Sequence, residues 1–221
     1  MSERVYLLPV WIRAWHATNA VLVIVLAITG FSLHFADPSL PLVPFALARR
    51  AHSIAGALLI GVYIIYITGN GLSGNWFHYI PKPPGVLRRS LHQIYYYCFG
   101  ILLCEANPHD PTPEHKFNDL QSIIYFVIMY GVMAIVAVTG LIFLYPQAAP
   151  DRIAGIDGLL PIAVLHYLTG SIIVLFLILH VYITTMGRTM FSLLYLIVTG
   201  WHQTRDPNPD GPRKTKEEGN P

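Results

Sequence analysis

Charged side chains are scarce in this chain of 221 residues. Asp, Glu, Lys and Arg make up 12% of the sequence, whereas 54% of the residues are hydrophobic. Such a composition is too apolar for an ordinary soluble domain. It predicts a membrane protein whose surroundings are lipid, and no nucleic-acid partner is expected.

Cysteine is also scarce, with only Cys98 and Cys104 in the whole sequence. No Cys-x-x-Cys-His motif occurs, which excludes a covalently attached c-type haem, and two cysteines cannot hold an iron–sulfur cluster alone. The sequence also lacks a phosphate-binding loop, a nucleophile–base pair and paired catalytic carboxylates. No substrate-activating site of its own is therefore expected.

Four long apolar stretches are present, at about 11–35, 51–72, 119–145 and 161–187. Each is long enough to cross the ~30 Å hydrocarbon core as a helix, and helices satisfy their own backbone hydrogen bonds there. The sequence thus predicts an all-α integral membrane protein with a bundle of four transmembrane helices. The first stretch is too long for the core of a signal peptide and has no convincing cleavage site, so it is expected to remain as a span.

Basic residues predict the orientation of these spans. With a cytoplasmic N-terminus, eleven Lys and Arg residues fall on the cytoplasmic side and only Arg49, Arg50 and Arg152 fall outside. Such a bias is typical of the positive-inside rule and places both termini in the cytoplasm of a bacterial inner-membrane protein. Cys98 and Cys104 then face a reducing compartment, where a structural disulfide is not expected.

The segment between the second and third spans, about 73–118, is expected to stay at the cytoplasmic surface. Between Leu87 and Leu102 apolar residues recur at helical spacing, which favours a helix lying in the membrane interface. A second interfacial helix is expected at about 188–198. We therefore expect one membrane domain over residues 1–200 and a disordered cytoplasmic tail over 201–221, which is rich in Pro, Gly and Lys.

Four histidines fall at two matched depths in these spans. His166 and His180 are 14 residues apart, which on a helix is about 21 Å and within ~40° of four full turns, so both leave the same face. His16 is level with His180 near the cytoplasm, and His52 is level with His166 near the outer surface. Imidazole is a good ligand for haem iron. The pattern predicts two non-covalent b haems with bis-histidine ligation.

Small and basic residues near the ligands fit the same interpretation. Gly56 and Gly170 each follow a histidine by one turn, and Gly30 shares the face of His16 at the depth of the outer pair, so a flat ring could approach closely. Thr139 and Gly140 fall in the third span, where they could line the same pocket. Helix packing alone would also explain these small residues. Arg13 and Arg50 could pair with haem propionates or simply flank the spans at the lipid headgroups.

Other interpretations of the histidines are possible. A zinc or copper site is disfavoured, because four nitrogens divided between two depths cannot form one tetrahedral site. A haem-free channel or transporter could use the histidines for protons. A self-sufficient transmembrane haem reductase, acting on a soluble acceptor without a protein partner, is a further alternative.

Several motifs resemble one known family along about residues 5–200. Ile12-Arg13-Ala14-Trp15-His16 with Thr29-Gly30 resembles the first helix of quinone-linked di-haem b-type cytochrome subunits. Arg50-Ala51-His52 with Gly56 is similar to the second-helix motif, and Lys116-Phe117-Asn118-Asp119-Leu120-Gln121 to the entry of the third helix. The spacing of His166 and His180 is also similar to that of the histidine pair in this family. The family includes the γ subunit of formate dehydrogenase and the cytochrome b subunits of nickel–iron hydrogenase and thiosulfate reductase.

The resemblance implies a membrane-anchor subunit that carries electrons between a periplasmic partner and the quinone pool. It implies two haem b groups bound by the four histidines. It also implies a site for menaquinone or ubiquinone beside the inner haem, formed in part by Asn118 and Gln121. From the residues alone, these two side chains could equally cap the third helix. An iron–sulfur or multihaem c-type subunit is the expected partner.

Overall fold

Four helices of the computed structural model are long and apolar enough to cross a membrane. The structure describes residues 4–35, 42–81, 83–109, 111–185, 189 and 191–203. Its candidate spans are α1 (Val10–His34), α2 (Phe45–Leu72), the composite segment Asp119–Leu144, and α6 (Leu159–Thr184). The prediction of an all-α membrane bundle is confirmed. The second helix starts six residues before the predicted boundary, directly after Pro44 at its N-cap. Proline is tolerated there because the first turn needs no N–H donor.

The third span is continuous in space but not uniform in its hydrogen bonding. It consists of α4 (Asp119–Phe126), the π-helical segment η3 (Val127–Val132) and α5 (Met133–Leu144). The hydroxyl of Tyr63 on α2 donates a 2.7 Å hydrogen bond to the carbonyl of Met129 within η3. A π segment changes the helical register, and such segments are frequent at functional sites. The hydropathy of the sequence did not indicate this π-helical segment.

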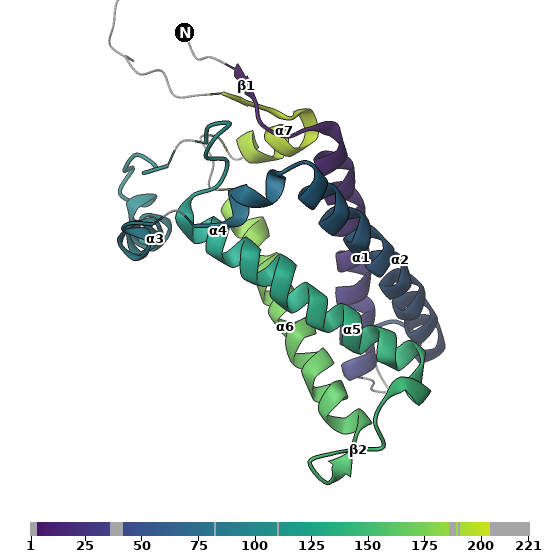
Figure 1. Cartoon of the computed structure of the whole chain (residues 1–221). Helices are drawn as coiled ribbons and strands as arrows, with labels where there is room; N and C mark the ends of the chain where they lie inside the picture. Colours follow the sequence, from purple (N-terminus) through teal and green to yellow (C-terminus); the bar gives the residue numbers. More distant parts are fainter. Residues whose placement is uncertain are drawn as a thin grey trace, which may run out of the picture.

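The spans form two neighbouring pairs, α1 with α2 and α5 with α6 (Figure 1). The buried apolar cluster lies where α2 meets the third span and consists of Leu59, Ile128, Val132 and Met133. Most other large apolar side chains of the spans are exposed on the outside of the bundle. Lipid, rather than protein, is the natural neighbour of those side chains.

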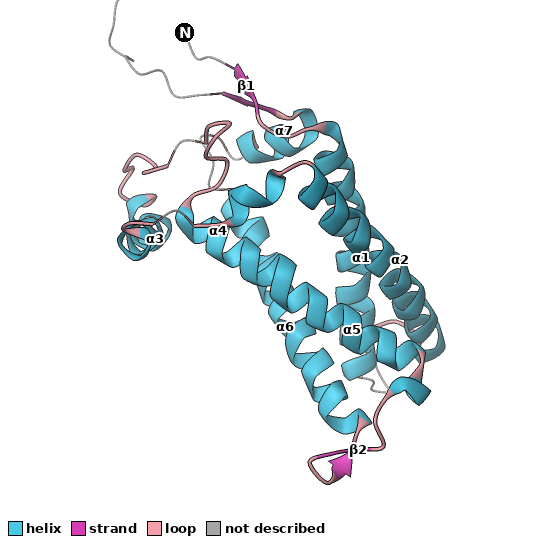
Figure 2. Cartoon of the chain, in the orientation of Figure 1, coloured by secondary structure: helices cyan, strands magenta, loops and turns pink. Residues whose placement is uncertain are grey.

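Short helices lie at the end of the bundle that holds the N-terminus of α1. They are η1 (Asn75–Tyr79), α3 (Val86–Tyr95), the π-helical η2 (Tyr96–Gly100) and α7 (Ser192–Thr199). The axis of α3 runs across the direction of the spans (Figure 2). The helix expected between Leu87 and Leu102 is therefore present as α3 and η2, and the helix expected at 188–198 is present as α7.

The two ends of the described chain meet in a small sheet. Strand β1 (Arg4–Tyr6) pairs antiparallel with β4 (Trp201–Gln203), and the rings of Tyr6 and Trp201 are in contact at 5.2 Å. The start of the expected disordered tail is thus an ordered strand, and residues 204–221 lie outside the described residues. At the opposite end, η4 (Pro146–Ala148) precedes a hairpin of β2 (Arg152–Ile153) and β3 (Ile156–Asp157).

Candidate haem and quinone sites

Two pairs of histidines face each other between helices of the bundle. His52 on α2 faces His166 on α6 with 6.3 Å between ring centroids. His16 on α1 faces His180, also on α6, with 6.0 Å between centroids. All four side chains are half-buried. The structure brings together the same two pairs as the sequence pattern, each contributed by two different helices.

The separation within each pair suits one metal ion that two imidazole nitrogens would bind. A bond from an imidazole nitrogen to a metal is ~2.0–2.1 Å long, and adding the distance from each nitrogen to its own ring centre gives roughly 6 Å between centroids. Within the described ranges, no group of three His, Cys, Asp or Glu side chains gathers into a metal site. Two protein ligands per metal leave the remaining coordination positions to another group, and a porphyrin supplies four nitrogens. The donor set therefore fits haem.

Threonines contact both rings of the His52/His166 pair. Thr29 Oγ1 on α1 lies 3.0 Å from His52 Nδ1, and Thr139 Oγ1 on α5 lies 2.9 Å from His166 Nδ1. Both threonine side chains are buried. Each histidine of this pair is therefore held by a hydroxyl from a neighbouring helix.

The glycine that follows each threonine lies against the same ring. A Cβ atom added to Gly30 would lie 3.2 Å from His52 Cε1, and one added to Gly140 would lie 3.3 Å from His166 Cε1. By contrast, a Cβ on Gly56 would meet only Leu26 at 3.9 Å, and one on Gly170 would enter open space. Gly30 thus makes room for the ligand itself, and close approach of a haem to Gly56 and Gly170 stays a prediction.

Arg13 and Arg50 lie in different surroundings. The Arg13 guanidinium donates a hydrogen bond to the carbonyl of Thr199, which joins α1 to the end of α7. Its Nε is buried and has no hydrogen-bond partner in the described structure. Arg50 is exposed on α2. Contacts of these residues with haem propionates stay predictions.

Asn118 and Gln121 form a capping box at the start of α4. Asn118 Oδ1 accepts a 2.8 Å hydrogen bond from the Gln121 backbone N–H, and Gln121 Oε1 accepts one of 3.1 Å from the Asn118 N–H. Asn118 Nδ2 also donates to the hydroxyl of Tyr97 at 3.3 Å. Burial raises the pKa of Tyr97 above its ordinary value, against the lowering effect of the hydrogen bond from Asn118. The side-chain oxygens of Asn118 and Gln121 both accept hydrogen bonds within the capping box. Only the side-chain amide N–H groups could therefore donate to a bound ligand.

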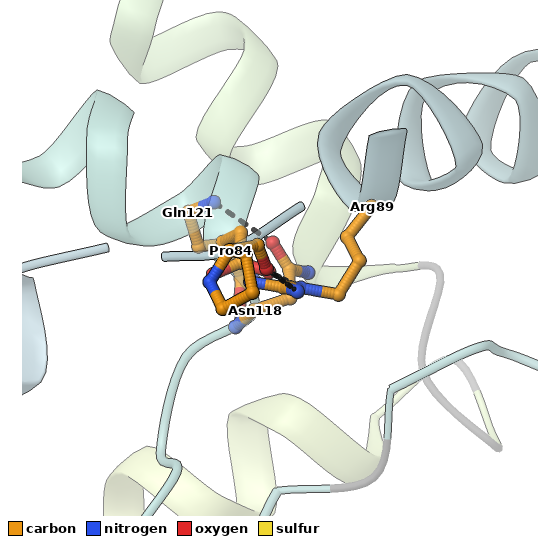
Figure 3. Close-up of polar contacts among 5 residues, drawn as sticks. Pro84, Arg89, Asn118 and Gln121 are labelled. Carbon is orange, nitrogen blue, oxygen red and sulfur yellow. Dashed lines mark hydrogen bonds and ion pairs between the residues drawn. The ribbon is translucent and has the colours of Figure 1, made fainter. Parts of the chain in front are cut away.

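An ion pair fixes α3 beside this cap (Figure 3). Arg89 on α3 donates to the carboxylate of Asp119, the residue after Asn118, and to the carbonyl of Pro84 at 2.5 Å. The hydrogen bond to Asp119 also raises the pKa of Arg89. As a result, α3 and η2 are tethered next to the capping box.

A chain of hydrogen bonds runs from the same end of the bundle into the spans. Lys116 Nζ donates to Asn75 Oδ1 at 3.0 Å, Asn75 Nδ2 donates to Asn70 Oδ1 at 2.7 Å, and Asn70 Nδ2 donates to the hydroxyl of Tyr130. Burial lowers the pKa of Lys116 and raises that of Tyr79 to about 12. A pocket of about 160 Å³, lined by Lys116 and Asn75 among others, opens at the start of this chain. The sequence pattern did not indicate this chain of hydrogen bonds, although Asn70 is a polar residue near the end of an otherwise apolar span.

Comparison with known proteins identifies the family. The model of prokaryotic cytochrome b561 matches residues 7–200. The chain belongs to this family. A relative in Escherichia coli (strain K12), named "Putative cytochrome YdhU", is 33% identical over 202 residues, which cover 91% of this chain and 76% of the relative.

Membership of the cytochrome b561 family confirms several expectations at a coarse level. The protein is a bacterial membrane cytochrome that binds b-type haem and transfers electrons. The resemblance to b-type cytochrome subunits is thereby confirmed. The four half-buried histidines are the residues whose placement suits such a cofactor.

Proposed function

We propose that this protein is the membrane-anchor subunit of a quinone-linked respiratory complex, with two b haems. The observation that carries this proposal is the presence of two facing histidine pairs, at 6.0 and 6.3 Å, that share helix α6. Their α6 ligands are 14 residues apart, which corresponds to about 21 Å along the helix. The two sites therefore lie at opposite depths of the membrane.

The residues of this chain hold and separate the two sites. His16 and His180 would ligate the inner haem, and His52 and His166 the outer one. Bound haem would supply one-electron chemistry at iron, and this chain would supply imidazole ligands and apolar surroundings, which tune the reduction potential. With haem bound, these two sites would allow electrons to cross the membrane between a partner on one side and quinone on the other.

Quinone would bind beside the inner pair, near the start of the third span. The amide N–H groups of Asn118 and Gln121 are the donors for a quinone carbonyl, because their oxygens are engaged in the capping box. The ring of Tyr125 on α4 lies 6.3 Å from that of His180, which connects this helix to the inner pair. Menaquinone and ubiquinone both carry the carbonyl oxygens that such donors recognise.

The partner would dock at the outer end of the bundle. The β1–β4 sheet places the described ends of the chain together, and the positive-inside rule puts that end in the cytoplasm. The periplasmic surface then comprises the start of α2, with Arg49 and Arg50, and the β2–β3 hairpin. An iron–sulfur or multihaem c-type subunit in contact with this surface would exchange electrons with the outer haem.

Ligand variants test the two-haem arrangement. We expect His16→Ala and His180→Ala each to remove the same haem, and His52→Ala and His166→Ala each to remove the other. Redox titration with haem quantitation measures this outcome. His92→Ala, on the exposed surface of α3, is the control and should retain both haems. Loss of the same haem from His16→Ala and His52→Ala would contradict the pairing.

A further inference from the structure

The two histidine pairs differ in what holds their rings. In the outer pair, both Nδ1 atoms are within hydrogen-bond distance of a buried threonine hydroxyl, at 3.0 Å for His52 and 2.9 Å for His166. In the inner pair, the ring of His180 is in contact with aromatic side chains instead, such as Phe176, with 5.4 Å between ring centroids. Among the residues that the structure describes, neither inner ring has a threonine partner of this kind.

The direction of the outer hydrogen bonds follows from the single proton of each hydroxyl. Thr29 Oγ1 donates to the Val25 carbonyl at 2.7 Å, and Thr139 Oγ1 donates to the Ile135 carbonyl at 2.8 Å. With that proton engaged, the oxygen is left to accept from the imidazole. Both rings therefore carry their proton on Nδ1, which leaves Nε2 with the lone pair that binds a metal.

We propose that Thr29 and Thr139 are positioning residues that fix the tautomer of both outer haem ligands and lower the reduction potential of the outer haem. A ligand imidazole that donates its second N–H to an oxygen becomes more basic. A more basic ligand stabilises Fe(III) over Fe(II), and so the potential falls. This inference rests on the proposed function, because His52 and His166 must ligate the same haem.

A glycine next to each threonine, on α1 and on α5, also lies against the histidine ring. Gly30 and Gly140 directly follow the two threonines, and a Cβ atom at either position would come within 3.2–3.3 Å of the ring that the threonine holds. In each Thr-Gly dipeptide, the threonine hydroxyl holds Nδ1 of the imidazole. The glycine leaves space for the adjacent Cε1 atom of the same ring. The same dipeptide contacts the outer pair from α1 and from α5.

Valine and serine variants test the role of the hydroxyls. Thr29→Val and Thr139→Val keep the side-chain shape but remove the acceptor, and we expect each to raise the midpoint potential of one haem only. Loss of a neutral hydrogen bond should change the reduction equilibrium roughly two- to tenfold, which is ~20 to ~60 mV for one electron. The double variant should add both shifts on the same haem. Thr29→Ser and Thr139→Ser should restore wild-type potentials.

Thr169 provides a matched control. It is as buried as Thr29 and Thr139 and makes the same kind of bond to a carbonyl of its own helix, Leu165, at 2.7 Å. No contact of its hydroxyl with a histidine ring is present among the described residues. Thr169→Val should leave both potentials unchanged.

A second measurement does not depend on electron transfer. In the haem-depleted protein, ¹⁵N spectra of labelled histidine should show His52 and His166 protonated on Nδ1, with the signal of the affected ring altered in each valine variant. Unchanged potentials and unchanged ¹⁵N signals in both valine variants would overturn the inference while the two-haem proposal stands. A shift of different haems by Thr29→Val and Thr139→Val would instead overturn the pairing of His52 with His166.

Discussion

At the scale of single residues, glycine decides how closely a helix can approach a haem ligand. Gly30 on α1 and Gly140 on α5 lie against His52 and His166, which come from other helices. A Cβ atom at either position would lie 3.2–3.3 Å from the imidazole, which is closer than ordinary van der Waals contact. These two glycines belong to the ligand geometry, while Gly56 and Gly170 have room around them.

Gly30→Ala should therefore weaken haem binding at the outer site. The added Cβ would lie 3.2 Å from His52 Cε1, and a ring fixed by both a threonine and an iron atom cannot move away freely. We expect a loss of about 1–3 kcal/mol, typical of overpacking, measured as reduced occupancy of one haem and a lower unfolding temperature.

Gly61→Ala is the control for this change. It lies on α2 with no atom within 4 Å of its added Cβ. Alanine favours a helix over glycine by up to ~1 kcal/mol, so the variant should retain both haems and unfold no earlier than wild type. Equal haem loss in both glycine variants would show that the effect is not specific to the ligand contact.

At the scale of elements, the start of α4 combines a helix cap with the proposed quinone site. The oxygens of Asn118 and Gln121 complete the capping box, and Arg89 ties α3 to the adjacent Asp119. The capping role and the quinone role use different atoms of the same amides. The two interpretations that the sequence left open are therefore compatible with each other.

Carboxylate variants separate the two roles. Gln121→Glu and Asn118→Asp keep an oxygen that accepts the backbone N–H, so the cap remains, but they remove the amide donors. We expect both haems to assemble with little change in thermal stability. Affinity for a quinone-analogue inhibitor should fall roughly 2- to 12-fold for each lost hydrogen bond, and further where the new charge repels a carbonyl oxygen.

The double variant Asn118→Leu with Gln121→Leu serves as a comparison for the two carboxylate variants. It removes the cap as well, which typically costs about 0.5–2 kcal/mol, so thermal stability should fall together with inhibitor affinity. Inhibitor binding at wild-type strength in all of these variants would place the quinone site elsewhere and leave both residues as helix caps.

At the scale of the whole molecule, one end of the bundle gathers the basic segments. Strand β1 pairs with β4, Arg13 bonds the end of α7, and Arg89 pairs with Asp119 at the start of the third span. Lys116 donates a hydrogen bond to Asn75 at the start of η1, the helix that follows α2. Four spans require both ends of the bundle domain to lie on one side, and the basic residues indicate which side that is.

Cysteine labelling in intact cells tests this orientation. The native Cys98 and Cys104 are both free and exposed, and they should react with a membrane-impermeant reagent only after permeabilisation. After replacement of both by Ser, Leu42→Cys at the opposite end should react without permeabilisation. The reverse pattern would invert the topology and move the redox partner to the cytoplasm.

The sequence by itself determined the four spans, their order and the pairing of the histidines by depth. These features depend on local quantities: the length of an apolar run, the rise of a helix and the spacing of His166 and His180 along one face. A helix between Leu87 and Leu102 was also predictable, because apolar residues recur there at helical spacing.

The contacts between atoms of different helices became apparent only in the folded chain. The contacts of Thr29 with His52 and of Thr139 with His166, the ion pair of Arg89 with Asp119, and the pairing of β1 with β4 join residues far apart in sequence. Hydropathy carries no information on such contacts, since lipid-facing and partner-facing surfaces of these helices are equally apolar. Their geometry arises from the relative rotation and tilt of packed helices, which side-chain packing and interhelical hydrogen bonds establish together.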